Sequence, residues 1–207
     1  MIINDKLIND KLINDESVVY NEILREGRRF DLKIRFLEEK DAQYMYDWMH
    51  DDDVTEHLKG NFKEKTIQDC EDFITAGREE AKAFIESGKN SANLHLAVAD
   101  DDDMYMGTVS LKHISYDNLT AEFAITVSRL AMGKGYAVFG MKSILKIGFD
   151  RGLEKIFWCV SEKNKRAVRF YDKNGYERTD DIPEEIKNQY ADIEKELLWY
   201  CATHHCK

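Results

Sequence analysis

Proline is nearly absent from this chain, which has one proline among 207 residues. Collagen-like and proline-rich disordered classes are therefore excluded, and 43% apolar residues suffice for a globular core. No apolar run approaches the roughly 18 residues of a membrane span. The first ten residues carry acids where a secretory signal peptide has basic and then apolar residues. We expect a soluble, cytoplasmic protein with no membrane partner.

Basic residues are fewer than acidic ones, 30 against 40, which gives a formal net charge of −10. This balance argues against nucleic-acid binding, which depends on Lys and Arg at phosphates. Four scattered cysteines predict no disulfide framework, and Cys70 and Cys159 lie in apolar patterns typical of a core. The tail at 201–206 holds two cysteines and two histidines, which form either a metal site or a frayed end. We expect no metal, because four ligands within six residues cannot easily close a tetrahedral site.

A pentapeptide repeat occupies the start of the chain, with INDKL at 3–7 and 8–12 and INDES at 13–17. Its period is far below the ~20 residues of the shortest solenoid units. We interpret residues 1–30 as a low-complexity extension and place one folded domain at 31–203.

Hydrophobic periodicity predicts the secondary structure of that domain. A strand at 32–37 precedes two helices; Asp41 can cap the first, Thr66 can cap the second and Gly88 can end it. Gly77 lies on the apolar stripe of the second helix, where it either weakens the helix or marks a close packing contact. The later strands are expected at 94–99, 104–114, 120–127, 156–160, 176–179 and 197–201, and the later helices at 135–151 and 164–173.

The strand at 120–127, the helix at 135–151 and the strand at 156–160 form one strand–helix–strand unit. Such a crossover makes its two strands parallel, whereas the preceding strands have the short turns of antiparallel hairpins. The expected fold class is therefore α/β (α+β), with a mixed, mostly antiparallel sheet that contains one parallel pair and has helices on both faces.

The loop that leads into the helix at 135–151 carries Gly133 and Gly135 around Lys134. Glycine lets the main chain approach a ligand closely, and the free N–H groups of a helix N-terminus attract an anion. From Arg129 to Lys173, eleven basic and four acidic residues give +7, which leaves −17 for the remainder. A glycine pair before a helix is often only a tight turn, but this charge asymmetry favours a phosphate-binding turn.

Two motifs in order, GKGYA at 133–137 and NKRAVRFYDKNGY at 164–176, resemble the GNAT superfamily of acetyl-CoA-dependent N-acetyltransferases over about residues 32–201. Within it, the chain is most similar to the branch of ribosomal-protein N-terminal and amino-sugar acetyltransferases. The resemblance implies a GNAT-like fold in which strands 120–127 and 156–160 splay apart. It also implies direct transfer of an acetyl group from acetyl-CoA to a primary amine. The alternative is a non-catalytic GNAT-like module that binds or senses acyl-CoA.

The resemblance further implies which residues contact acetyl-CoA. The phosphate-binding loop falls on Met132, Gly133, Lys134, Gly135, Tyr136 and Ala137. Met132 replaces the polar residue that is usual in the family. The pantetheine arm would pair with the strand edge near Ile125 and Val127, which is a ready hydrogen-bonding template. Asn164 would contact the cofactor, serve as a helix N-cap, or do both.

Two residues are expected to carry the chemistry. Tyr171 falls at the family's position for the general acid that protonates the departing thiolate, unless it is an ordinary core tyrosine. Glu122 lies where related enzymes often keep a carboxylate that removes the amine proton, unless it is a solvated strand residue. His113 and His95 are alternative bases by pKa.

The acceptor is expected beside the connection at 48–62, which Asp51, Asp52, Asp53 and Glu56 make acidic and therefore favourable to a cationic amine. An α-amine or amino sugar, with a pKa near or below ~8, loses its proton more readily than a Lys side chain at ~10.4. The expected acceptor is a small molecule or a peptide: a protein N-terminal α-amine, an amino sugar or another small amine. The chain would act as a monomer or a homodimer.

Overall fold

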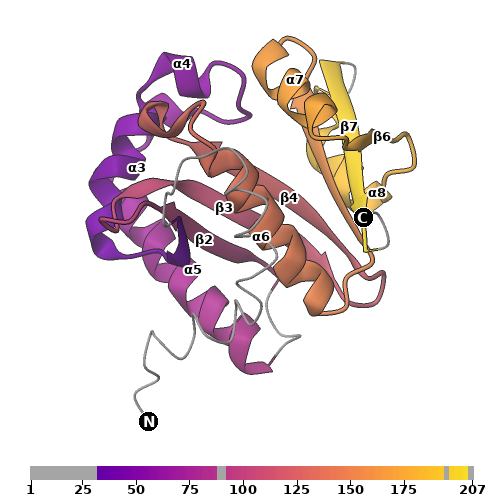
Figure 1. Ribbon diagram of the computed structural model, residues 1–207, viewed down its shortest axis with the longest axis horizontal. Coiled ribbons are helices and arrows are strands. Elements are labelled where there is room, and N and C mark those ends of the chain that lie inside the picture. The colour runs from indigo at the N-terminus through magenta and orange to yellow at the C-terminus, as the bar shows by residue number, and fades with distance from the viewer. Residues whose placement is uncertain (1–31, 88–91, 194–195, 205–207) are drawn as a thin grey trace.

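The computed structural model describes residues 32–87, 92–193 and 196–204. The INDKL repeat and Gly88, the predicted end of the second helix, lie outside these residues. The described residues form a seven-stranded sheet with the order β1-β2-β3-β4-β5-β7-β6 (Figure 1). Only the pair β4 and β5 within this sheet is parallel. The expected mixed, mostly antiparallel α/β architecture is confirmed.

The strands lie close to their predicted bounds. They are β1 (Lys33–Phe36), β2 (Leu94–Ala99), β3 (Tyr105–Ser115), β4 (Thr120–Val127), β5 (Lys155–Ser161), β6 (Glu177–Arg178) and β7 (Leu197–Thr203). The helices are α3 (Ala42–Met49), α4 (Asp52–Thr55), α5 (Ile67–Ser87), α6 (Tyr136–Asp150), α7 (Lys165–Lys173) and α8 (Glu184–Lys187). The short 3-10 turns are η2 (Glu39–Asp41), η3 (Phe62–Glu64), η4 (Arg129–Ala131) and η5 (Asn188–Tyr190). Helices α4 and α8 were not predicted, because four residues are too few to show a helical period.

Helices cover both faces of the sheet (Figure 1). On one face α5 runs unbroken through Gly77, where a Cβ would lie 3.4 Å from Leu37 and 3.5 Å from His95, so this glycine marks a close packing contact. On the other face α6 approaches so closely that a Cβ at Gly140 would lie 2.8 Å from the side chains of Val98 and Val109. Thr66 caps α5 as predicted, since its hydroxyl accepts the backbone N–H of residue 69 at 3.2 Å.

The sheet divides into two arms at the parallel pair. β4 and β5 are paired over three residues each, and the last registered pair joins Glu122 to Phe157. β4 then follows β3 as far as Val127, while β5 follows β7 as far as Ser161. The arm of β1–β4 and the arm of β5, β7 and β6 therefore diverge, which confirms the predicted splay (Figure 1).

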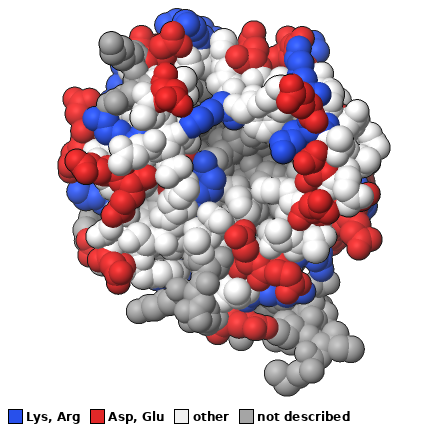
Figure 2. Space-filling view, turned by 180° about the vertical axis from the view of Figure 1, so that it is seen from behind, with Lys and Arg blue, Asp and Glu red and all other residues white. Residues whose placement is uncertain are grey.

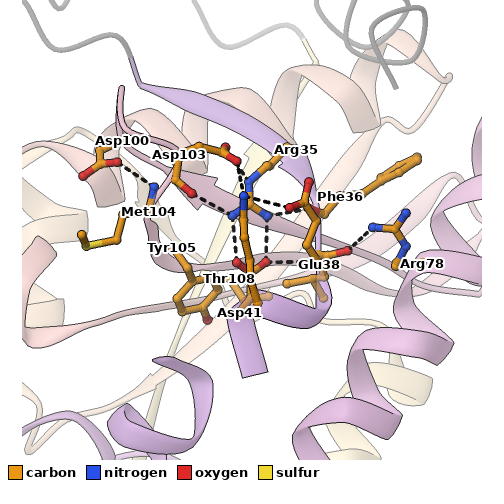
Figure 3. Close-up of polar contacts among 12 residues, drawn as sticks. Arg35, Phe36, Glu38, Asp41, Arg78, Asp100, Asp103, Met104, Tyr105 and Thr108 are labelled. Carbon is orange, nitrogen blue, oxygen red and sulfur yellow. Dashed lines mark hydrogen bonds and ion pairs between the residues drawn. The ribbon is translucent and has the colours of Figure 1, made fainter. Parts of the chain in front are cut away.

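A buried ion pair fixes the start of the domain (Figure 3). Arg35 of β1 donates two hydrogen bonds to the Asp41 carboxylate, at 2.7 and 2.8 Å, and the two side chains are 7% and 0% exposed. Asp103, in the turn between β2 and β3, accepts a further bond from Arg35 Nε at 2.8 Å and pairs with Lys40. The expectation that the Asp41 side chain caps α3 is wrong: it makes no cap hydrogen bond there, because Arg35 and the Glu38 backbone N–H take its oxygens.

No helix within the three described ranges is both long and apolar enough to cross a membrane.

Replacement of Arg35 by Met should lower the free energy of unfolding by about 3–5 kcal/mol, because it leaves the Asp41 carboxylate buried without its partner. Replacement of Lys40 by Met is the matched control, because Lys40 is half exposed and its ion pairs with Glu38 and Asp103 contribute about 1 kcal/mol or less. Urea unfolding of both variants measures the difference. An Arg35→Met variant no less stable than Lys40→Met would contradict the importance of this pair.

Candidate active site

Two glycines shape the turn that opens α6. Gly133 and Gly135 have positive φ angles of 73° and 93°, a conformation that favours glycine, and Gly135 is the N-cap residue of the helix. A Cβ at either position would meet no atom within 4 Å, so the main chain here faces open space. Lys134 between them is exposed. The turn thus presents bare backbone and a helix N-terminus to a ligand, as an anion site requires.

The residues on either side of these glycines are less exposed. Tyr136 is 5% exposed and belongs to the main hydrophobic core, so only its backbone is left to contact a ligand. Ala137 is half-buried. Met132 packs against the smaller core around α3 and lies with its sulfur 2.9 Å from the Arg166 guanidinium. The predicted loop therefore offers a ligand mainly the main chain of residues 133–136 and the Lys134 side chain.

The edge of β4 faces the gap between the arms. Ser128 N donates to Met106 O at 2.8 Å, so Val127 and its partner Gly107 form a pair without hydrogen bonds between them. Orientation alternates along a strand, so the main-chain groups of Val127 and Ile125 point away from β3 and toward β5. The registered pairing with β5 has already ended at Glu122. Among the residues that the structure describes, no strand pairs with this edge beyond Glu122, as predicted.

The segment that leads into this glycine turn is tied to α4. Asp53 pairs with Arg129 at 2.8 Å, and its backbone carbonyl accepts a hydrogen bond from Arg166 of α7 at 3.2 Å. Because Arg166 belongs to the other arm, these contacts join α4 to both sides of the gap. Arg129, the first residue of the basic stretch, thus carries an ion pair.

The acidic connection at 48–62 is less acidic in effect than its sequence indicates. Asp51 caps α4 through the backbone N–H of Asp53, at 3.0 Å, and Asp52 pairs with Lys63 at 2.6 Å. Since the Asp53 charge is also paired, most of the carboxylates there have local partners. A surface pocket of about 410 Å³ lies on this connection, lined by Asp52, Thr55, Glu56, Gly60, Asn61, Phe62 and Lys63. Fewer unpaired carboxylates therefore remain on this connection than the sequence indicates.

Asn164 is the N-cap residue of α7, because its side chain accepts the Ala167 backbone N–H at 3.0 Å. The simpler of the two interpretations is thus confirmed for this residue, and contact with a cofactor stays a prediction.

Tyr171 of α7 lies in an aromatic cluster behind β5. Its ring centroid is 5.5 Å from that of Trp158, 5.1 Å from Tyr200 and 6.4 Å from Tyr176. Burial raises the pKa of Tyr171 far above its ordinary value, and the Cys159 thiol on β5 adds to the increase. The hydroxyl therefore keeps its proton at neutral pH, and no described residue hydrogen-bonds it. Such a group can donate a proton, so packing and the acid role are compatible.

Glu122 lies at the fork between the arms and is 2% exposed, so its alternative interpretation as a solvated strand residue is wrong. One carboxylate oxygen, Oε1, accepts a bond from Lys112 Nζ at 2.7 Å and another from the Tyr190 hydroxyl. The second oxygen, Oε2, is buried without a hydrogen-bond partner among the described residues, with His113 Nε2 3.6 Å away. The carboxylate is thus held through Oε1, while Oε2 has no hydrogen-bond partner in the described part of the chain.

The two histidines differ in their relation to this site. His113 approaches Glu122 but is half exposed, at a positive φ of 50°. His95 lies between α5 and the sheet, with Nδ1 2.7 Å from Ser110 Oγ and its ring 4.9 Å from Phe73. Burial lowers the pKa of His95, so it is neutral and packed.

The C-terminal residues do not gather into a metal site where they are described. Cys201 packs in the apolar cluster of β5, β7 and α8, and the His204 ring lies 5.7 Å from Phe149. Within the described ranges no group of three or more His, Cys, Asp or Glu could hold a metal ion. His205 and Cys206 lie outside those ranges.

Sequence reasoning missed three neighbours of Glu122: Lys112, Tyr190 and Cys159. Lys112 could have been paired with Glu122 from the hairpin register, which places the two residues opposite each other. Tyr190 has no such signal, because 68 residues separate it from Glu122.

Seen from behind, the molecule is hollowed near the upper middle of its face, where the arms diverge in Figure 1, with basic and acidic side chains around the rim (Figure 2).

Comparison with known families decides the assignment. Residues 31–177 match the family model described as an acetyltransferase (GNAT) domain. The chain belongs to this GNAT family. The membership in the GNAT superfamily that the two motifs predicted is thus confirmed. The narrower resemblance to ribosomal-protein and amino-sugar acetyltransferases is not confirmed.

Two curated relatives resemble this GNAT chain in sequence. Spermidine N(1)-acetyltransferase of Vibrio cholerae serotype O1 is 29% identical over 109 residues, which are 51% of this chain and 63% of the relative. The enzyme of the same name from Escherichia coli K12 is 29% identical over 113 residues, 52% of this chain and 61% of the relative. The matched part therefore spans less than two thirds of either relative.

Solved structures share the fold over most of the chain. A spermidine N-acetyltransferase from Vibrio cholerae in complex with CoA and spermine has a TM-score of 0.62 at 19% identity and covers 84% of this chain and 95% of that one. A microcin C7 self-immunity acetyltransferase in complex with acetyl-CoA and AMP has a TM-score of 0.65 at 16% identity, with 83% and 92% covered. At these identities the likeness shows a common GNAT fold.

Replacement of Gly135 by Glu should abolish measurable CoA binding, because it places a carboxylate and a side chain in the open space above the turn. The matched control is Gly152→Glu, at the other end of α6, where φ is 90° and a Cβ likewise meets nothing within 4 Å. Both variants should lose about 1–2 kcal/mol of stability from left-handed strain. Calorimetry with CoA distinguishes the two variants. Equal CoA affinity in both would show that the phosphate site does not lie at this turn.

Proposed function

We propose that this protein transfers an acetyl group from acetyl-CoA to a primary amine of a small acceptor. One observation carries the proposal: the strands β4 and β5 part immediately after Glu122 and Phe157, between a buried tyrosine on one arm and a buried carboxylate on the other. A glycine turn with a helix N-terminus follows β4 directly. Family membership of residues 31–177 supports the same conclusion.

The described residues fit acetyl-CoA, which when bound supplies the acetyl group as a thioester. Gly133 and Gly135 offer open backbone, and the N–H groups at the start of α6 would hold the pyrophosphate. The main-chain groups of Ile125 and Val127 would hydrogen-bond an extended amide-containing arm along the free edge of β4. Lys134 adds an exposed positive charge beside the turn.

Tyr171 would act as the general acid. Its hydroxyl keeps its proton at neutral pH, and its pKa is raised partly by Cys159, which lies on β5 beyond the fork. Its ring packs on Trp158, the residue of β5 that follows the last pair with β4, so the acid would act from the β5 side of the gap.

Glu122 would act as the general base. Its Oε2 lacks a hydrogen-bond partner in the described part of the chain and can accept the proton that an ammonium must lose before its nitrogen can attack. Lys112 and Tyr190 hold the other oxygen, which fixes the direction of Oε2. The acid and the base would then lie on opposite arms of the fork.

The acceptor proposed is a small primary amine, with polyamines as the first class to test. The names of the two sequence relatives, both spermidine acetyltransferases, support polyamines. A protein N-terminal α-amine and an amino sugar are the other acceptors suggested by the sequence. The paired carboxylates of Asp52 and Asp53 leave less free negative charge for a polycation than the sequence indicates.

Replacement of Tyr171 by Phe should lower kcat by roughly 10²–10⁴-fold, since a general acid contributes about that much, and should leave CoA affinity unchanged. Tyr176→Phe is the matched control: its ring also packs on Trp158, at 5.1 Å, and loses only a hydroxyl. Steady-state release of CoA thiol, with calorimetric binding of CoA, gives both quantities. Equal losses of kcat in the two variants would show that Tyr171 is not the general acid.

A panel of amines should identify the acceptor class. We expect spermidine to give a higher kcat/KM than an amino sugar, a peptide with a free α-amine, or an N-blocked peptide with one lysine. Thiol release with each acceptor is the measurement. Preference for the free α-amine would replace polyamines as the acceptor class, whereas CoA binding without turnover on any amine would favour a non-catalytic binding module.

A further inference from the structure

Tyr190 crosses from one arm of the sheet to the other. It ends η5, in the connection between β6 and β7, yet its hydroxyl donates a hydrogen bond to Glu122 Oε1 on β4. The segment that carries it lies beyond residue 177, where the match to the family model ends. Tyr190 is thus an addition to the fork that neither the motifs nor the family match includes.

Contacts from both arms hold the Tyr190 ring in place. On its own arm the ring packs against Trp199 at 5.4 Å between centroids, beside the buried Ile186 of α8. From the other arm Lys59 places its ammonium 4.8 Å from the ring centroid and donates a hydrogen bond to the Gln189 carbonyl. A ring held on two sides has one orientation, so its hydroxyl has a fixed direction.

The charged and titratable groups around Glu122 come from three elements. Lys112 and His113 approach from β3, Cys159 from β5 and Tyr190 from η5. Lys112 and Tyr190 both bind Oε1, while Oε2 is buried without a hydrogen-bond partner among the described residues. The carboxylate is therefore anchored by one oxygen alone.

We propose that Tyr190 is a positioning residue that keeps Glu122 ionised and directs its free oxygen, Oε2, toward the acceptor amine. A hydrogen bond donated to the charged form of a carboxylate stabilises that form. Without it, Lys112 alone would hold Oε1, and the carboxylate could rotate about its terminal bond. The role of Glu122 as the base rests on the proposed function; the effect of Tyr190 on its ionisation does not.

The protonation states of the two neighbours Tyr190 and Cys159 support this assignment. Burial and then the charge of Glu122 raise the pKa of Tyr190 far above its ordinary value. Burial and then Glu122 likewise raise the pKa of Cys159 to about 12. Both neighbours therefore keep their protons at neutral pH, and neither can accept one from an ammonium.

The first test measures Glu122 without any turnover. Carbon-13 NMR of the labelled carboxylate should show the Glu122 pKa rising by about one pH unit or more in Tyr190→Phe, because a hydrogen bond to the charged form is lost. Lys112→Met should raise it as well. Tyr116→Phe is the matched control, since it removes a buried hydroxyl that has no hydrogen-bond partner in the described residues. An unchanged Glu122 pKa in Tyr190→Phe overturns the proposal, whether or not the protein turns over an amine.

The second test uses the acetyl-transfer reaction. In Tyr190→Phe the acidic limb of kcat/KM against pH should move upward together with the NMR value. At neutral pH kcat should be about tenfold lower, because Oε2 loses its fixed direction, and CoA affinity should be unchanged. Tyr116→Phe should match the wild type. A tenfold loss without movement of the acidic limb would reduce Tyr190 to a packing residue and overturn the proposal. Absence of turnover in the wild type with every amine would reject the proposed function, and the NMR result would still decide the role of Tyr190.

Discussion

The early end of the pairing between β4 and β5 is the constraint on which the rest of the structure depends. The last pair joins Glu122 to Phe157, and bulky side chains occupy both faces just beyond it. On one face Phe123 meets Trp158 edge to face at 5.5 Å, and on the other Tyr190 binds Glu122. These contacts fill the fork without continuing its backbone ladder. Backbone donors and acceptors of β4 thus stay available, and the side chains proposed as acid and base, Tyr171 and Glu122, lie on either side of one opening.

Charged side chains form contacts across that opening. The net charge of −10 conceals a basic stretch from Arg129 to Lys173, but the structure shows that part of this basic charge is already paired. Arg129 holds Asp53 of α4, and Arg166 of the other arm holds the carbonyl of the same residue. The acidic connection and the basic stretch therefore neutralise each other where they meet. The turn itself stays exposed together with Lys134.

The sequence was sufficient for features encoded by neighbouring residues. Alternation and hairpin spacing placed β2 and β4 at their observed bounds, and Gly133 and Gly135 marked the turn because positive φ favours glycine. Features that depend on distant partners could not be predicted in the same way. Asp41 satisfies the pattern of a helix cap, yet its carboxylate binds Arg35 of β1. The Tyr190–Glu122 contact joins segments 68 residues apart, and no sequence periodicity indicates such a contact.

The position of β7 within the sheet also determines the order in which the fork can be built. β7 lies between β5 and β6, and all seven residues of β5 have a registered partner in it. The first arm is formed by strands within residues 33–127, whereas the second needs the strand at Leu197–Thr203 to cover the edge of β5. During synthesis, the strands of the first arm can therefore pair fully while β5, a strand of largely apolar residues, still has a long edge without a partner strand. The segment that bears Tyr190 is made before β7, but it gains its Trp199 support only when β7 arrives.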